Sequence, residues 1–396
     1  MKKIVKVLLV TGKIAEARVR KTAEKHGCGV YVAPVDVVSF LKLDMIEARG
    51  YDMIIVPGLV KGDLAAVEKR TGIKTYLGPK DLADLELMLE NLENLKLSKT
   101  VPACEFLREE MKKKAQDEIA KADSAEYVKE VLKRPGSMLI GDLPVGRDFP
   151  MRVLAEIVDV GSMKADAIVK RAKYYVRSGA DIVDLGFNER NPERVREVIA
   201  AVRGFGVPIS VDTMERSNIE AVLEAGADLI LSFDRALIEE FENVRTPCVI
   251  IPKNKGIPDY PEERVKVLND NIALARKRGF ENIIADLLLQ PVNFGFVRSV
   301  EAYRRFSEKY NYPMLMGVGN ITELFDADSA GVNALLCGIA GECGASMLLT
   351  TEASAKTKGC VKELKTASQM IYLSKKRGSF PKDLGIDLLR LKKKRM

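Results

Sequence analysis

The sequence predicts an α/β protein in which a (β/α)8 TIM barrel follows a small open α/β domain and a helical connector. From residue 152 onward, apolar segments of strand length alternate with amphipathic helical segments. Gly-ended helices lead directly into apolar runs at residues 178–185 and 225–231. Eight such units over about 200 residues are what a TIM barrel requires, and an open doubly wound sheet is the competing architecture.

The first 100 residues predict a small Rossmann-like α/β domain with parallel strands. Apolar runs predict strands at residues 3–10, 29–33 and 52–58, the last of which ends in a Pro-Gly turn. Helices are expected over residues 15–26 and 37–49.

The remaining boundaries follow from changes in composition. A charged helical stretch closed by Arg134-Pro135-Gly136 predicts a connector over residues 101–137. The barrel is expected over residues 138–355, and C-terminal helices with a basic tail over residues 356–396. The barrel strands are expected at residues 152–158, 181–185, 208–211, 228–231, 248–251, 282–285, 313–316 and 332–336.

Composition excludes several functional classes. A net charge of +7 is modest for 396 residues, and much of it lies in the tail at residues 392–395, so no nucleic-acid partner is expected. Aromatic residues make up only 6% and Trp is absent, which removes the stacking platforms of single-strand binders. No apolar run of about 18 residues occurs, and the N-terminus has no cleavage site, so we expect a cytoplasmic protein without a membrane partner.

Histidine and cysteine usage narrows the chemistry further. His26 is the one histidine and lies outside the predicted barrel, so a Ser-His-Asp triad or a His-rich metal centre there is excluded. The six cysteines include no CxxC pair, which argues against a disulfide framework and a closed zinc site.

Polar residues follow the predicted barrel strands, where TIM barrels carry their catalytic groups. Carboxylates and amides dominate this set, which suits a neutral heterocycle with several N–H donors and suits a phosphate-rich substrate poorly. For a single Asp, a role as helix N-cap is as good an explanation, but it explains the whole set less well. The set comprises Asp159, Asp184, Asn188, Asp212, Ser232, Asp234, Lys253, Asn254, Asp286, Gln290, Asn293 and Asn320.

Three motifs carry a family resemblance. All three resemble segments of dihydropteroate synthase in the same order. They are Ser-Gly-Ala-Asp-Ile-Val-Asp-Leu-Gly at 178–186, Val-Pro-Ile-Ser-Val-Asp-Thr at 207–213, and the apolar helix-to-strand segment at 220–230. The resemblance is good over residues 153–234 and is specific for the pterin-binding superfamily. That superfamily also contains tetrahydrofolate- and tetrahydromethanopterin-dependent methyltransferases that work with corrinoid partners. The whole chain most closely resembles archaeal dihydropteroate synthase-related proteins with an extra N-terminal domain.

The resemblance implies roles for three carboxylates. Asp212 matches the synthase Asp that lies against the pterin ring. Asp286 lies where the family places the carboxylate that pairs with the 2-amino and N3 edge of the pterin, an orientation-fixing contact. Asp184 matches the acid at the end of strand two, for which ligand contact and bonding to loop amides are equally compatible.

The sequence departs from the synthase pattern at four places. Residues 157–162 replace the synthase loop after strand one, and Ser232 replaces the Asn that ends strand four. Gly-Val-Gly-Asn at 317–320 replaces the Ser-Arg-Lys signature, and no match exists for the Arg near strand eight. These missing groups hold the departing pyrophosphate in a synthase. Gly-Val-Gly-Asn instead resembles the Gly-Leu-Ser-Asn of pterin methyltransferases, in which the Asn lies close to pterin N5.

We therefore expect a pterin-dependent transferase, with methyl or one-carbon transfer involving reduced pterin (tetrahydromethanopterin or tetrahydrofolate) as the leading hypothesis. The alternatives are a divergent dihydropteroate synthase, in which Lys253 or the N-terminal domain replaces the lost cations, and a non-catalytic pterin-binding subunit. Asn320 and Asp159 are the expected catalytic residues. The expected pterin-binding residues are Asp184, Asn188, Asp212, Ser232, Asp286, Gln290, Asn293 and Asn320.

Partners follow from the same resemblance. A corrinoid protein is the expected methyl acceptor or donor, and the family favours a homodimer through the last barrel helices. No bound metal is expected, because the rim carboxylates lie on different strands and not at metal-ligand spacing along the chain. The N-terminal domain is expected either to dock a partner or to cover the barrel mouth.

Overall fold

The computed structural model describes residues 5–389, so the basic tail at 392–395 lies outside the described residues. The described chain forms two compact units. One runs to Asp117 and includes the segment from Ser374 onward; the other runs from Glu118 to Leu373. Among the described residues, no helix combines the length and apolar character needed to cross a membrane.

The first unit contains a sheet of parallel strands within residues 7–77, in the order β2-β1-β3-β4. The short edge strand β4, which pairs with β3 alone, is absent from the strands predicted above. The strands are β1 (Val7–Thr11), β2 (Gly29–Val32), β3 (Met53–Val56) and β4 (Lys74–Leu77), and the helices are α1 (Glu16–His26), α2 (Leu64–Thr71) and α3 (Leu85–Glu90).

The helix expected over residues 37–49 is wrong. Only two 3-10 turns form there, η1 (Val38–Phe40) and η2 (Leu43–Met45). The guanidinium of Arg70 in α2 donates hydrogen bonds to the carbonyl oxygens of Leu43 at 2.8 Å and Ile46 at 3.0 Å. A side chain thus satisfies backbone acceptors that a helix would have satisfied internally.

The C-terminal segment completes the first unit. Arg377, at the end of α14 (Cys360–Arg377), donates to the Asp84 carboxylate at 2.8 Å, and Leu384 is buried. Burial raises the pKa of Asp84 to about 6 although Arg377 opposes the shift. One helix, α14, forms where several C-terminal helices are predicted. The described residues after α14 form turns and irregular chain.

The second unit begins with helical segments and a hairpin and then forms the barrel. Before it, η4 (Ala103–Glu105) lies in the first unit, the boundary at Asp117 falls within α4 (Arg108–Lys121), and α5 (Ala125–Val131) lies in the second unit. A helical stretch was predicted here, and the hairpin that follows it was not.

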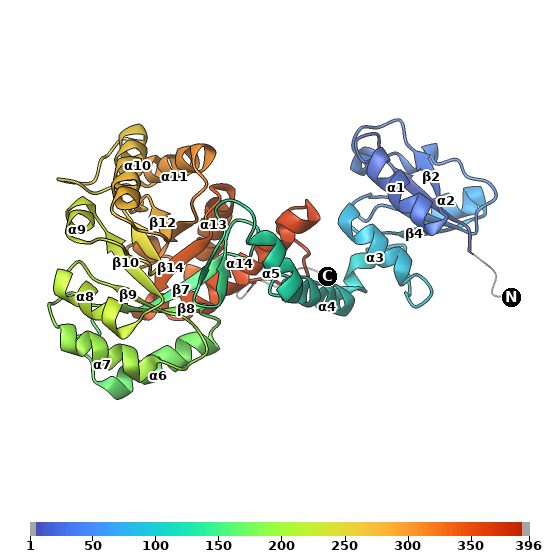
Figure 1. Ribbon diagram of the computed structural model, residues 1–396. Coiled ribbons are helices and arrows are strands. Elements are labelled where there is room, and N and C mark those ends of the chain that lie inside the picture. The colour runs from blue at the N-terminus through green and yellow to red at the C-terminus, as the bar shows by residue number, and fades with distance from the viewer. Residues whose placement is uncertain (1–4, 390–396) are drawn as a thin grey trace. The chain divides into compact units, whose positions relative to one another are not determined.

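Eight parallel strands within residues 152–351 close into a barrel in the order β10-β11-β12-β13-β14-β7-β8-β9, which confirms the predicted TIM-barrel fold. Figure 1 shows its helices surrounding these strands. The strands are β7 (Arg152–Ile157), β8 (Ile182–Gly186), β9 (Ile209–Asp212), β10 (Leu229–Phe233), β11 (Cys248–Ile250), β12 (Ile283–Asp286), β13 (Met314–Gly317) and β14 (Met347–Thr351). The helices between them are α6 (Ala165–Arg177), α7 (Pro192–Val202), α8 (Arg216–Ala225), α9 (Arg235–Glu240), α10 (Pro261–Lys277), α11 (Phe296–Lys309), α12 (Gly319–Thr322) and α13 (Ser329–Glu342).

The predicted position of the eighth strand is wrong. Residues 332–336 lie inside α13, and the strand is β14, which begins at Met347. In α13 the buried residues are Asn333, Leu336, Cys337 and Ala340, whose spacing of three and four residues marks one face of a helix. A short apolar run does not by itself distinguish a buried strand from such a helix.

The N-terminal end of the barrel is covered by an antiparallel hairpin of β5 (Met138–Ile140) and β6 (Leu143–Val145). Ile140 and Val145 of this hairpin are buried in one cluster with strand residues such as Leu154, Ile182 and Leu229. The hairpin therefore supplies part of the core at the end opposite the carboxyl ends of the strands.

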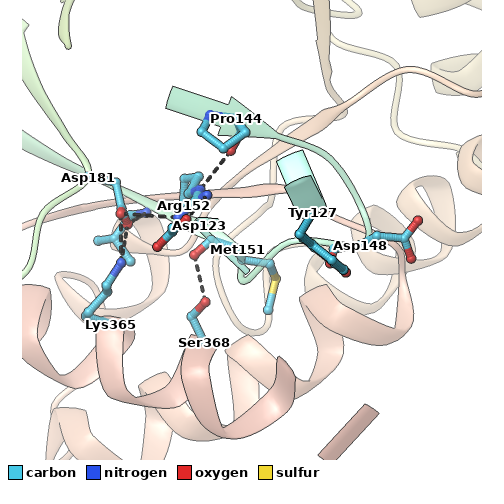
Figure 2. Close-up of polar contacts among 10 residues, drawn as sticks. Asp123, Tyr127, Pro144, Asp148, Met151, Arg152, Asp181, Lys365 and Ser368 are labelled. Carbon is cyan, nitrogen blue, oxygen red and sulfur yellow. Dashed lines mark hydrogen bonds and ion pairs between the residues drawn. The ribbon is translucent and has the colours of Figure 1, made fainter. Parts of the chain in front are cut away.

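A buried arginine forms polar contacts with several segments at the N-terminal end of the barrel, as Figure 2 shows. Arg152, at the start of β7, donates from Nε to the Pro144 carbonyl at 2.8 Å and from Nη2 to Asp123 Oδ1 at 2.8 Å. Its Nη1 lies 3.8 Å from Asp181 Oδ1, which also accepts a hydrogen bond from Lys365 of α14 at 2.7 Å. The network joins the hairpin, the first strand and the last helix of the unit.

Candidate active site at the mouth of the barrel

Three carboxylates converge inside the barrel from neighbouring strands. Glu156 of β7 and Asp184 of β8 are register partners, and Gly186 pairs with Asp212 of β9 in the same way. One carboxylate oxygen from each of Glu156, Asp184 and Asp212 lies within 4.8 Å of those of the other two. No bound metal is expected from the sequence, because the rim carboxylates lie on different strands. That premise is wrong, because strand pairing brings carboxylates of neighbouring strands together.

The environment of the cluster disfavours negative charge. Asp184 is fully buried; its Oδ1 accepts from Ser210 Oγ at 2.5 Å, and its Oδ2 has no hydrogen-bond partner among the described residues. Burial and then the nearby Asp212 and Glu156 carboxylates raise the pKa of Asp184 well above its usual value. Burial, with Asp212 as the second cause, raises the pKa of Glu156 to about 7, and burial raises the pKa of Asp212 to about 6.

Glu156 is absent from the residues predicted from the sequence. The available signal was a glutamate directly after the apolar run at residues 153–155, because a charged residue is seldom placed among buried neighbours without a role. Gly186 makes room for it: a Cβ at this position would lie 2.7 Å from Glu156 Oε1. The glycine that ends β8 thus allows the glutamate to lie against the neighbouring strand.

Asp286 ends β12 on another side of the mouth and is buried. Its Oδ1 accepts from the Leu288 backbone N–H at 2.7 Å and from the hydroxyl of Tyr303 in α11. No donor among the described residues contacts Oδ2. Burial raises the pKa of Asp286 to about 6, and the two hydrogen bonds oppose that shift.

Two predicted residues share the loop after β12. Asn320 of α12 donates from Nδ2 to the Leu289 carbonyl at 3.2 Å, and Gln290 donates from Nε2 to the Leu288 carbonyl at 3.4 Å. The structure thus brings Asn320 and Gln290 to the loop that begins at Asp286.

The other predicted residues lie farther out or stand alone. Asp159 and Asn188 are exposed, and Asn188 Nδ2 donates to Asp159 Oδ1 at 2.7 Å, so they pair with each other at the outer rim. Asn293 lies in an exposed turn with a left-handed φ of 68°, and its side chain forms no hydrogen bond within the described residues. Ser232 is partly buried on β10.

Asp234 has the alternative role considered above for a single aspartate, that of a helix N-cap. Its side chain caps α9 by accepting from the Leu237 N–H at 3.1 Å, and it pairs with Lys253 at 3.0 Å. Lys253 is therefore already engaged by a carboxylate. Within residues 5–389, no Lys or Arg forms an ion pair with Glu156, Asp184, Asp212 or Asp286, so the interior of the mouth is acidic and unbalanced.

This barrel matches the family model described as "pterin binding enzyme" over residues 156–349, a stretch from Glu156 into β14. An uncharacterized protein of Methanocaldococcus jannaschii is 40% identical, in an alignment covering 100% of this chain and 79% of that protein. The chain belongs to the pterin-binding enzyme superfamily. The resemblance stated from the motifs is thereby confirmed.

Other similar proteins of this superfamily are dihydropteroate synthases. The dihydropteroate synthase of Clostridium beijerinckii is 29% identical to this chain. The alignment covers 38% of this chain and 65% of the synthase, a little under two thirds of its length. Among solved structures, the dihydropteroate synthase of Thermus thermophilus in complex with 6HMPPP is similar with a TM-score of 0.45 and 21% identity. That match covers 59% of this chain and 97% of the other.

Proposed function

We propose that this pterin-binding enzyme is a transferase that moves a methyl or other one-carbon group to or from a reduced pterin bound at the barrel mouth. Tetrahydromethanopterin and tetrahydrofolate are the two candidates. The observation that carries the proposal is an acidic rim at which Asp286 Oδ2 has no protein partner among the described residues and Asn320 donates to the loop that follows Asp286. Such a rim matches the N–H-rich edge of a pterin and repels a pyrophosphate.

Binding is assigned first to Asp286. The carboxylate accepts from the 2-amino group and N3–H of the pterin, and its fixed Oδ1 sets the direction from which the ring enters. Asp212, on β9 and so three strands from β12 around the barrel, contacts the ring, and Asp184 lies beside Asp212 in the carboxylate cluster. Ser232, Gln290, Asn188 and Asn293 are assigned to the periphery of the ligand.

Catalysis is assigned to Asn320 and Asp159. When the N5–methyl bond breaks, N5 keeps the electron pair, and an amide N–H from Asn320 stabilises the developing charge. Asp159, held by Asn188, supplies a carboxylate at the outer rim, where the methyl acceptor approaches. A corrinoid protein is the proposed acceptor or donor, and a homodimer is the proposed assembly.

A divergent dihydropteroate synthase is the second candidate, and the identity to the Clostridium beijerinckii synthase favours it. That reaction needs cationic groups for the departing pyrophosphate. Lys253 is the candidate from the barrel, but its pairing with Asp234 reduces its availability.

A two-arm assay tests the proposal. Methyl-tetrahydromethanopterin and methyl-tetrahydrofolate are offered with a corrinoid acceptor, and loss of the methyl group is followed. In parallel, hydroxymethyldihydropterin pyrophosphate is offered with an arylamine, and condensation is followed. Methyl loss supports the proposal, and condensation alone supports the synthase. Calorimetric pterin binding without turnover in either arm supports a non-catalytic binding subunit.

A further inference from the structure

The carboxylates of Glu156, Asp184 and Asp212 form a set of oxygen donors with a spacing fixed by backbone pairing. They belong to adjacent strands, and their closest oxygens lie within 4.8 Å of one another. Two oxygens on opposite sides of a hard divalent cation are separated by about 4 to 5 Å, twice the metal–oxygen distances of Mg²⁺ and Ca²⁺. The cluster thus already has the dimensions of a coordination shell.

A separate observation, on the carboxylate of Asp184, points to a ligand at the same place. Asp184 has no exposed surface, and its Oδ2 accepts no hydrogen bond within the described residues, while Ser210 occupies only Oδ1. A buried carboxylate oxygen without a partner is costly, because it loses its hydration and gains no hydrogen bond in return. Neither lysine nor arginine compensates for it, since none of the described ones pairs with the cluster.

The backbone also leaves space at the same point. A Cβ on Gly186 would lie 2.7 Å from Glu156 Oε1, so any other residue there would displace this carboxylate. The oxygen-only donor set excludes soft metals in favour of hard cations, because the cluster contains no sulfur or imidazole donor.

We propose that Glu156, Asp184 and Asp212 bind one hard divalent cation of the Mg²⁺, Mn²⁺ or Ca²⁺ class inside the barrel mouth. Ser210 positions Asp184 by holding Oδ1, which leaves Oδ2 for the ion. This site reverses the metal-free expectation drawn from the sequence. It does not depend on methyl transfer, because all its donors belong to the protein.

Manganese is the probe for the test. Mn²⁺ is titrated into the full-length protein without pterin, and free Mn²⁺ is followed by electron paramagnetic resonance, with Mg²⁺ and Ca²⁺ as competitors. The wild type binds one Mn²⁺ with a dissociation constant well below about 1 mM. Glu156→Gln weakens binding roughly 10- to 100-fold, because it removes one charged ligand.

Two further variants separate coordination from general charge and from misfolding. Glu189→Gln removes the same charge from an exposed position in the loop after β8 and leaves Mn²⁺ affinity unchanged. Gly186→Ala keeps every charge, displaces Glu156 and lowers affinity at least several-fold. Circular dichroism melting of each variant establishes that the fold is retained.

Wild-type protein that binds no Mn²⁺ up to millimolar concentration overturns the inference, as does Glu156→Gln with unchanged affinity. Protons shared among the carboxylates, or N–H groups of a ligand, then satisfy the cluster. Pterin binding is measured separately by calorimetry. Pterin binding without Mn²⁺ binding refutes only the cation site, whereas Mn²⁺ binding without pterin binding refutes only the proposed function.

Discussion

The hydroxyl of Tyr303 donates a hydrogen bond to Oδ1 of Asp286, the same oxygen that accepts the Leu288 N–H at 2.7 Å. Two donors therefore fix one oxygen of the carboxylate and leave the other for a ligand. The tyrosine comes from α11 and the aspartate from β12, so helix packing sets the orientation of the group assigned to the pterin edge. Tyr303 acts through Asp286 and is a positioning residue.

Tyr303→Phe is expected to weaken pterin binding roughly 10-fold or more, because a hydrogen bond to a charged group contributes about 1.5–3 kcal/mol. The lost bond also lowered the pKa of Asp286, so the pH below which pterin binding declines moves upward. Calorimetry across pH measures both effects. Tyr310→Phe, a hydroxyl removal just beyond the same helix, is the control, and an identical pH profile in Tyr303→Phe and wild type contradicts the positioning role.

Asp286→Asn is expected to weaken pterin binding by about 2–3 kcal/mol, the cost of replacing a charge-assisted acceptor by a neutral amide. The amide keeps the shape of the side chain and an oxygen that accepts from Leu288 N–H. Calorimetry with a reduced pterin measures the change. Wild-type affinity in this variant removes Asp286 from the site.

The same variant alters stability with pH. In the folded protein the pKa of Asp286 is raised to about 6, above its ordinary value of 3.8. The carboxyl group therefore favours folding below about pH 4, and this contribution is lost as pH rises through 6. The loss is of the order of 3 kcal/mol for a shift of about two units. Relative to wild type, unliganded Asp286→Asn should gain stability between about pH 4 and 7 in urea unfolding, and a difference that stays constant with pH argues against the shift.

Asn320→Ala is expected to lower the methyl-transfer rate roughly 10- to 1000-fold with little change in pterin affinity. The reason is that a hydrogen bond at N5 strengthens as N5 becomes the leaving group. Single-turnover kinetics with methyl-loaded pterin measure the rate, and Asn311→Ala, an exposed amide that precedes β13 and so lies away from the carboxyl ends of the strands, is the control. Condensation of pterin pyrophosphate that survives in Asn320→Ala, with no methyl loss from the wild type, favours the synthase.

Arg152→Met is expected to destabilise the barrel by about 3–5 kcal/mol, because it removes a buried guanidinium, leaves the buried Pro144 carbonyl without this donor and takes one cation from Asp181 (Figure 2). Denaturant unfolding followed by circular dichroism measures the loss. Arg196→Met removes an exposed ion pair with Glu224 and should cost less than about 1 kcal/mol. Equal losses in the two variants would show that the network at the hairpin adds nothing to stability.

The barrel was predictable because its helices are amphipathic and several end in glycine before an apolar strand. The eighth strand was misplaced because residues 332–336 are apolar over a length that suits strand and helix equally, and only their burial in α13 decides between them. The helix expected over residues 37–49 was wrong because Arg70, from a later helix, binds the carbonyl groups of that segment. Contacts of this kind join distant residues and leave no local pattern.

Only part of the candidate site was predicted, because some of its residues also depend on contacts between distant parts of the chain. Asp212 and Asp286 end their strands, where TIM barrels place functional groups, and Asp184 lies in the motif at residues 178–186, so all three were predicted. Glu156 lies within its strand, one residue before the end of β7, and Tyr303 lies on a helix, so neither follows a strand. Their importance depends on strand register and helix packing, which the order of residues along the chain does not reveal.

The return of the C-terminal segment to the first unit has a consequence for biosynthesis. Residues 5–117 leave the ribosome before the barrel does, yet Arg377 and Leu384, which belong to the same unit as residues 5–117, are made after it. Until then the Asp84 carboxylate lacks its guanidinium partner. The barrel strands, which end at Thr351, are synthesised in full before the first unit acquires its final core. The unit whose larger segment is translated before the barrel is therefore completed after it.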